Sequence, residues 1–592
     1  MHKSTIALSM CLIAVFASAS LAQVASFRSQ ATKGVLKDDL DRAAGDATFL
    51  GTGYFTTLDT NKNIEIYSNL TNPGATDYLL DPNAASANRF LIGTSGKLFS
   101  SLPALSSALF FTLNNTETDQ PFVLNGIACN GFGSYSTRTF NNNGTYYDAS
   151  GDQTNEQTAN NYGFLLNNTY KFSDQMRGGL LITRNDNITT DTRAGVAGNA
   201  FAELGLLNPT GANVALFAAP FALNAVTQHA FSSIGNETTA QEHNQHINNP
   251  TTLFQVGMNR GISDQLNADF FLEGGATRTT TCDSGKYSYS VSQGAGSLLS
   301  QSQSVRYNVS AGGVRIGGGG RLNFAFSQNT RSNLTLGYTG IFGDYQNYTT
   351  SASSYSNVDA TGPNTTTLAV SGNTSDSASN GTHAVNQISF CNMNTFKRGD
   401  HLEFGIGVGY QYSHTSNEYT DVVHVAQTTS YTDGTVLGAG NYNGNYSSTV
   451  SQKVTDVTDV NLIRFPVGFG YKFGKSLNWE FRMGANADIL LQKRSVERTD
   501  DQLLNVNGQF VYNGNTTLLN NLAGTAMTDS RVGVIPAPKQ TVVTYSYGLG
   551  WQPVDKMKVD LLAFFGGPAA GAGSLLDVNM FRRLALSITF VF

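Results

Sequence analysis

The chain of 592 residues has a net charge of −6, only 13% of its residues are charged, and it contains 61 Gly, 36 Phe and 25 Tyr. This composition, with abundant Asn, Thr and Ser, suits strands and turns better than helices and indicates an all-β protein. The small net charge and the lack of basic runs with interleaved aromatic residues argue against nucleic acid as a partner.

Residues 1–22 have the layout of a secretory signal peptide. Lys3 supplies a positive charge, Ile6 to Ala17 form an apolar stretch, and the segment ends in small residues suited to cleavage before Gln23. The stretch is shorter than the roughly 20 residues that a membrane-spanning helix needs. No later segment is apolar over that length, so we expect no transmembrane helix in the mature chain.

Residues 23–104 are less regular than the rest of the chain. Phe49 to Thr57, Asn63 to Tyr67 and Arg89 to Phe99 fit either two first strands or a periplasmic or plug segment. The sequence leaves both alternatives open.

From residue 105 to residue 592, apolar and polar residues alternate with period two. Phe481 and Met483 share one face of such a segment, for example, and Glu480 and Arg482 share the other. This alternation predicts strands with one apolar and one wet face. Strands are expected at about 105–113, 161–172, 176–184, 251–262, 266–278, 305–328, 334–345, 385–396, 401–415, 454–473, 476–492, 540–552, 555–566 and 579–592.

The connections between these strands alternate between short and long. Short turns are expected near 170–176, 261–266, 396–402, 471–477 and 551–557, where aromatic residues would form an interfacial girdle. Long polar connections are expected at about 116–160, 185–250, 279–304, 346–384, 416–453 and 493–538. The rhythm predicts a transmembrane antiparallel up-and-down β-barrel, with short periplasmic turns and long extracellular loops, rather than a sandwich.

The last segment alternates apolar and other residues and ends on Phe590, Val591 and Phe592. In this pattern the chain resembles Gram-negative bacterial outer-membrane β-barrel proteins of the porin kind. The resemblance implies a bacterial outer-membrane location, contact with lipid and lipopolysaccharide, and recognition of Phe590 and Phe592 by the barrel-assembly machinery. Such barrels have an even number of strands, which fits about fourteen, or sixteen if the residues before 105 add two.

If the apolar faces meet lipid, the opposite faces line a lumen. The charged residues on these faces are Asp269, Glu273, Arg315, Arg321, Glu403, Arg464, Lys472, Glu480, Arg482, Asp488, Lys556, Lys558 and Asp560. Both signs occur in similar number, which favours a path for small solutes and argues against strong ion selectivity. The alternative is that these groups pair with one another and fill the barrel.

The predicted connection from Gly195 to Val226 is unusually apolar for a surface loop. Its large side chains include Phe201, Leu204, Phe217 and Phe221. An apolar patch of this size needs burial, which predicts a constriction loop in the lumen or an apolar ligand site. The alternatives are packing over the barrel mouth and a contact between protomers.

Neither a metal site nor a catalytic site is expected. Glu242, His243 and His246 have side chains that bind zinc or nickel, but a solvated polar loop is favoured for them. Cys129 and Cys282 could form a disulfide, and unpaired thiols are the favoured interpretation. The familiar nucleophile, phosphate-loop and zinc-protease motifs are lacking, so we expect a protein without cofactors that is not an enzyme.

The first hypothesis for the function is a channel that passes small hydrophilic solutes by passive diffusion. The second is a transporter of hydrophobic compounds that resembles the long-chain fatty-acid family, which combines fourteen strands with an N-terminal hatch. The third is a structural or adhesive surface protein that works through its polar loops. The sequence does not indicate the solute or the oligomeric state.

Overall fold

The computed structural model describes most of the chain from Ser26 to Val591. The described residues are 26–45, 48–50, 58, 64–71, 86–99, 101–118, 122–124, 127–129, 133–140, 146–202, 235–293, 297–359, 366–433, 442–474, 476–512, 515–519, 531–536, 539–554, 556–565 and 584–591. The expected signal peptide, Leu204, Phe217, Phe221 and Phe592 therefore lie outside the described residues.

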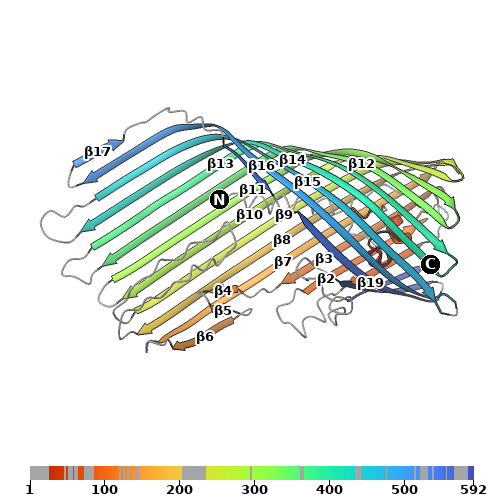
Figure 1. Cartoon of the computed structure of the whole chain (residues 1–592), viewed down its shortest axis with the longest axis horizontal. Coiled ribbons are helices and arrows are strands. Elements are labelled where there is room, and N and C mark those ends of the chain that lie inside the picture. The colour runs from red at the N-terminus through yellow and green to blue at the C-terminus, as the bar shows by residue number, and fades with distance from the viewer. Residues whose placement is uncertain are drawn as a thin grey trace.

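Sixteen antiparallel strands form one closed barrel (Figure 1). They are β1 (Glu65–Thr71), β2 (Ser86–Gly96), β3 (Leu105–Thr118), β7 (Tyr146–Lys171), β8 (Met176–Ala202), β9 (Gly235–Ser263), β10 (Leu266–Gln293), β11 (Ser297–Ser327), β12 (Thr330–Asp359), β13 (Thr366–Arg398), β14 (Leu402–Asp433), β15 (Tyr442–Phe473), β16 (Trp479–Tyr512), β19 (Gln540–Val554), β20 (Met557–Phe565) and β21 (Leu584–Val591). The short strands β6 (Gly133–Phe140), β17 (Asn515–Leu519) and β18 (Arg531–Pro536) extend the sheet locally, and β4 (Phe122–Leu124) pairs with β5 (Ile127–Cys129).

The barrel closes between its first and last strands. β1 is antiparallel to both β2 and β21, and Ile66 of β1 lies opposite Phe590 of β21. Closure matters because hydrocarbon offers no partner to a free strand edge. The all-β barrel and the alternative count of sixteen strands are confirmed, and the main count of fourteen omitted β1 and β2 because the sequence alternates weakly there.

Strands β7 to β16 are longer than the sequence predicts. β13, for example, has 33 residues and a length of about 110 Å, whereas about ten tilted residues cross a membrane. The predicted long connections do lie opposite the short turns, but most of their residues continue the strands (Figure 1). Period-two contrast fades there because both faces of the extensions are polar, while Thr, Tyr and Ser still pair across strands.

The outer surface carries the apolar face of the strands near the short turns. Val256 is 63% exposed and Leu272 is 74% exposed, and similar residues recur around the barrel. Aromatic rings lie at the turns as expected, with the Trp479 and Trp551 centroids 5.4 Å apart. In the described part of the chain, no helix is both long and apolar enough to cross a bilayer.

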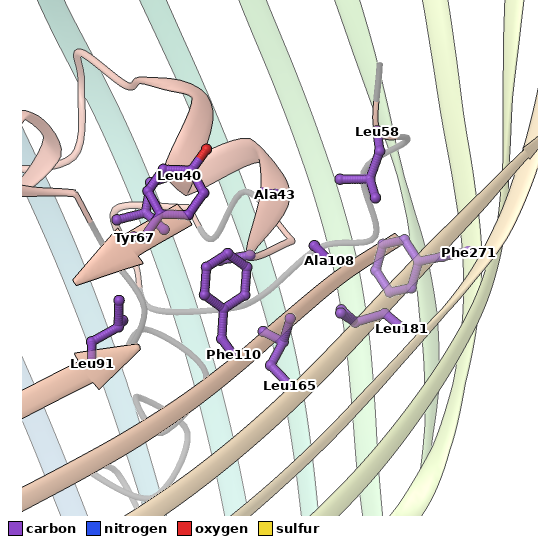
Figure 2. Packing of buried hydrophobic residues seen from close by; sticks show 11 residues of the cluster. Leu40, Ala43, Leu58, Tyr67, Leu91, Ala108, Phe110, Leu165, Leu181 and Phe271 are labelled. Carbon is purple, nitrogen blue, oxygen red and sulfur yellow. The ribbon is translucent and has the colours of Figure 1, made fainter. Parts of the chain in front are cut away.

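Two short helices, α2 (Phe27–Ala31) and α3 (Asp39–Ala43), lie inside the barrel near its short-turn end (Figure 1). Leu40 and Ala43 of α3 pack against inward-facing side chains such as Phe110 and Leu165 (Figure 2). The other members of this buried cluster are Ala44, Leu58, Tyr67, Leu91, Ala108, Leu181 and Phe271. The described residues from Ser26 to Leu50 are called the plug below.

Candidate functional site: the lumen and its obstructions

The carboxylate of Asp41 joins the two helices of the plug. The Ser26 side chain caps α2 by accepting from Ser29 N, and the Asp38 side chain caps α3 by accepting from Leu40 N. Asp41 completes the α3 capping box and also accepts from Ser26 N at 2.8 Å and Ser26 Oγ at 2.6 Å. Asp41 therefore joins the starts of both helices, which orders the pair as a unit.

Ion pairs join the plug to the barrel wall. Arg28 Nη2 lies 2.6 Å from Glu403 Oε2 on β14, and Arg28 Nε lies 3.0 Å from Glu480 Oε1 on β16. On the other side, Lys558 Nζ of β20 donates to Asp38 Oδ2 at 3.1 Å. The side chains of Arg28 and Glu480 are only 13% and 12% exposed, so these pairs are less screened than surface ion pairs.

Glycines on the inner wall make room for the plug. A Cβ added at Gly468 would lie 2.7 Å from the Thr32 Cβ, and one at Gly548 would lie 2.9 Å from the Ala31 Cβ. Gly405 and Gly407 face Val35 and Phe49 in the same way; with Gly409 and Gly484, these glycines form the seat of the plug. Any larger side chain at the seat would force the plug away from the wall.

The end of the plug covers a buried thiol. Phe49 and Leu50 pack with Cys391 of β13, which is 4% exposed, and Met393 and Leu462 pack against this cluster. Arg464 Nη1 donates to the Phe49 carbonyl oxygen. The thiol therefore faces the lumen but lies beneath the plug.

The pKa values of two carboxyl groups in the plug are shifted in opposite directions. Burial raises the pKa of Asp41 to about 7, with repulsion from Asp38 as the next cause. For Asp38, burial acts in the same direction, but Lys558, Arg482 and Arg28 outweigh it and lower the pKa to about 2. Burial would lower the pKa of Arg28, but Glu480 and Glu403 outweigh it and hold this pKa above its usual value.

The structure places the nine main lumen candidates on the inner wall, where each has a charged partner. The pairs are Asp269 with Arg321, Glu273 with Arg315, Arg464 with Asp488, Glu480 with Arg482 and Arg28, Arg482 with Asp560, and Glu403 with Arg28. The N–O distances run from 2.6 to 3.1 Å. The wall is thus polar and internally neutralised, while Lys472 and Lys556 lie exposed near the short turns.

A cluster of aromatic residues lies on the inner wall further from the short turns. The Tyr345 ring of β12 stacks on the Tyr419 ring of β14, with centroids 4.6 Å apart, although β13 lies between the two strands. Gly381 of β13 is the register partner of both tyrosines, so no side chain separates the rings. With Tyr307 and Val309 of β11, these residues form the tyrosine cluster on the inner wall, in which Tyr307, Val309 and Tyr345 are buried.

Sequence reasoning did not identify the tyrosine cluster and placed the constriction elsewhere. Phe201 was expected in a constriction loop, but its backbone belongs to β8 and lies opposite Tyr147 of β7. Pairing of β7 with β8 continues there because an extended polar segment still satisfies its backbone hydrogen bonds across strands.

His243 was expected in a loop but lies in β9, where its Nε2 is 2.9 Å from Asp283 Oδ1. Cys282 is a free thiol, so it forms no disulfide with Cys129. Within the described ranges, no three His, Cys, Asp or Glu side chains are arranged to hold a metal ion.

The chain matches no family model and no curated protein sequence. Among solved structures it is similar to a mutant of the ferric enterobactin receptor PfeA from Pseudomonas aeruginosa, at 10% identity over 93% of this chain and 84% of that chain, with a TM-score of 0.25. The siderophore receptor PirA from Pseudomonas aeruginosa gives 7% identity over 92% and 84% of the chains and a TM-score of 0.25. The copper transporter OprC gives 9% identity over 91% and 84%, with a TM-score of 0.20. Scores this low carry no argument about function; the closed sheet and its apolar outer surface make this chain an outer-membrane β-barrel.

Proposed function

We propose that the barrel carries small hydrophilic solutes across the outer membrane by diffusion through its polar lumen, without catalysis, and that the plug restricts this passage. The inner wall supports the proposal because its charges are paired and of both signs, so neither cations nor anions are strongly favoured. The tyrosine cluster is the second restriction.

The observation that carries the proposal is that the plug is attached to the sheet through side-chain contacts and not as a strand of the sheet. β1 completes its backbone pairing with β2 and β21, and the plug adds no strand to the barrel. Displacement of the plug would therefore break side-chain contacts such as Arg28 with Glu403 while the ladder of the barrel stays intact.

Transport of hydrophobic compounds is the less supported candidate. The helices inside the barrel favour it, since the fatty-acid transporter resemblance implies an N-terminal hatch. The strand count of sixteen departs from the fourteen that this resemblance implies, and the wall around Arg28 is charged.

Conductance of the purified mature protein in planar bilayers tests the proposal. The wild-type protein should be mostly closed, and Arg28→Glu, which places like charges beside Glu403 and Glu480, should give frequent openings with weak ion selectivity. Arg184→Glu is the control, because Arg184 is exposed and its ion pair is with Asp186, two residues away on the same strand. A steady large conductance of the wild type would contradict the restriction, and closed barrels in every variant would favour a structural or adhesive role.

A further inference from the structure

The short turns at one end of the barrel carry an excess of positive charge. Ten Lys and Arg residues and four Asp residues occur in segments 97–104, 171–177, 260–266, 327–331, 397–402, 472–478 and 552–556. The whole chain has a net charge of −6, so the sign of this end is opposite to that of the rest of the molecule. Charge of one sign around the opening of a pore favours ions of the other sign. We call this opening the short-turn mouth.

Three of these bases lie close together on the inner side of the mouth. They are Arg331 of β12, Lys397 of β13 and Lys472 of β15, which we call the basic arc. Since side chains alternate between the two faces, Lys397 shares the inner face with Cys391 beneath the plug, and Lys472 shares it with the seat glycine of β15. Arg331 is the register partner of Thr395, two residues from Lys397. One strand, β14, separates Lys397 from Lys472, so their backbones lie roughly 10 Å apart.

The basic arc differs from the wall behind it because its charges are not paired. The wall charges described above each have a charged partner within 3.1 Å. Among the described residues, no carboxylate forms an ion pair with Arg331, Lys397 or Lys472, and all three are exposed. The turn after Lys397 also contains Arg398 and Asp400, whose charges cancel. The arc is therefore a set of like charges in contact with water.

Most carboxylates on the other side of the mouth have basic partners. A cavity of about 210 Å³ lies there between the plug and strands β20, β21 and β1, and its lining includes Asp38, Asp39, Glu65 and Asp560. Lys558 Nζ lies 3.1 Å from Asp38 Oδ2 and 3.3 Å from Asp560 Oδ2. Asp39 lies 3.9 Å from Arg42. The excess of exposed positive charge therefore lies along β12 to β15.

We infer that the basic arc makes the short-turn mouth selective for small hydrophilic anions, such as carboxylates and phosphates. The inference rests on the proposed transport function and deepens it, because the paired wall alone favours neither sign. Exposed ammonium and guanidinium groups raise the local concentration of anions and oppose the entry of cations. Their field extends over the Debye length, about 30 Å at 0.01 M salt and about 3 Å at 1 M salt. The selectivity is therefore a property of dilute salt and is lost in concentrated salt.

Quenching of tryptophan fluorescence measures the anion concentration at this mouth whether or not the barrel is open. The two tryptophans of the chain, Trp479 and Trp551, stack on each other, and Trp479 is the register partner of the residue after Lys472. The full mature protein is studied in an uncharged detergent. At about 0.01 M salt, iodide should quench the wild type at least about twofold more strongly than the variant with Lys397→Gln and Lys472→Gln. Acrylamide, an uncharged quencher, should act equally on both. Lys453→Gln is the matched control, because it removes an exposed charge near the opposite end of β15.

Reversal potentials in planar bilayers test whether the same charges select the ions that permeate. Gly468→Val, an uncharged change at the seat, supplies the open barrel. In a gradient of dilute KCl this variant should prefer chloride to potassium at least about twofold, and the addition of Lys397→Gln and Lys472→Gln should remove the preference. At about 1 M salt both barrels should select weakly, because the arc is screened and the wall is paired.

The two measurements separate the inference from the proposed function. Equal iodide quenching of the wild type and the double lysine variant in dilute salt would overturn the inference. If quenching depends on the arc while the barrel stays closed in every plug variant, the transport function fails and the attraction of anions to the mouth stands. If the barrel opens without a preference for chloride in dilute salt, the transport function stands and the arc does not select anions.

Discussion

Arg28 Nη2 and Glu403 Oε2 lie 2.6 Å apart, although 375 residues separate them in the sequence. The contact joins α2 of the plug to β14 of the barrel wall. Since the side chains are 13% and 21% exposed, the pair is largely shielded, and removal of one partner costs more free energy than at a surface ion pair.

Exchange of the two charges should restore closure. Arg28→Glu alone should raise the open probability in planar bilayers, because loss of a shielded pair costs about 2 kcal/mol and adds repulsion. Combination with Glu403→Arg should lower the open probability again, although Glu480 keeps the recovery partial. If the effect of the double variant on the open probability equals the sum of the effects of the two single variants, Arg28 and Glu403 do not interact.

A side chain on the seat should displace the plug without damage to the barrel. Gly468→Val would place atoms within 2.7 Å of Thr32, and overpacking of this kind costs about 1–3 kcal/mol. We expect increased conductance with an unchanged heat-modified gel mobility of the barrel. Gly274→Ala is the control, because a Cβ there meets nothing nearer than the Arg315 carbonyl oxygen at 4.0 Å. Equal conductance of the two variants would show that the seat does not hold the plug.

The tyrosine cluster should limit the current once the plug is displaced. Tyr345→Ala removes the stack on Tyr419, worth about 0.5–1.5 kcal/mol, and widens the lumen at that level. In the Arg28→Glu background the single-channel conductance should therefore rise further. Tyr348→Ala, at a position that is 49% exposed, should leave the conductance unchanged. The prediction is wrong if Tyr345→Ala behaves like Tyr348→Ala.

Closure by the plug should weaken as the pH rises toward 8. Asp41 is in the plug and spans no part of the membrane, and its pKa is about 7 when seated against an ordinary value of 3.8. Because the pKa is higher in the seated plug, protonation of Asp41 stabilises the seated state. This free energy is fully present below about pH 4 and is lost as the pH rises through 7. Open probability should therefore increase between pH 5 and pH 8.

Asp41→Asn should flatten this dependence, because the amide stays neutral over the whole range. Asp38 does not confound the test, since its pKa is lowered to about 2 and its contribution is lost only on strong acidification. An open probability that is constant from pH 5 to pH 8 in the wild type would refute the role of Asp41.

The sequence predicts the barrel well because lipid imposes a strict alternation. Phe481 and Arg482 on opposite faces of β16 follow directly from period two, and the short turns follow from their position after aromatic residues. The extensions of the strands were not predicted because water contacts both of their faces, so apolar and polar residues do not alternate there. Segment 279–304, for example, reads as loop and is strand up to Gln293 and again from Ser297.

The site was harder to predict because it depends on contacts between distant residues. Gly405, Gly407 and Gly468 lie on the wet faces in the sequence pattern, and small residues repeated on such a face signal close approach by another segment. No local pattern pairs Arg28 with Glu403, or brings Tyr345 to Tyr419 across β13. Those relationships arise only from closure and narrowing of the barrel.

Oxidative cross-linking of the plug to the wall tests the central claim, that residues near Leu50 lie in the lumen, most directly. The Thr48 side chain lies within hydrogen-bonding reach of the Cys391 thiol. In a chain with Cys129→Ser and Cys282→Ser, the Thr48→Cys variant should form an intramolecular disulfide with Cys391, seen as a mobility change on a non-reducing gel. The same chain with Cys391→Ser should show none. Failure of Thr48→Cys to cross-link in folded, membrane-inserted protein would contradict the account.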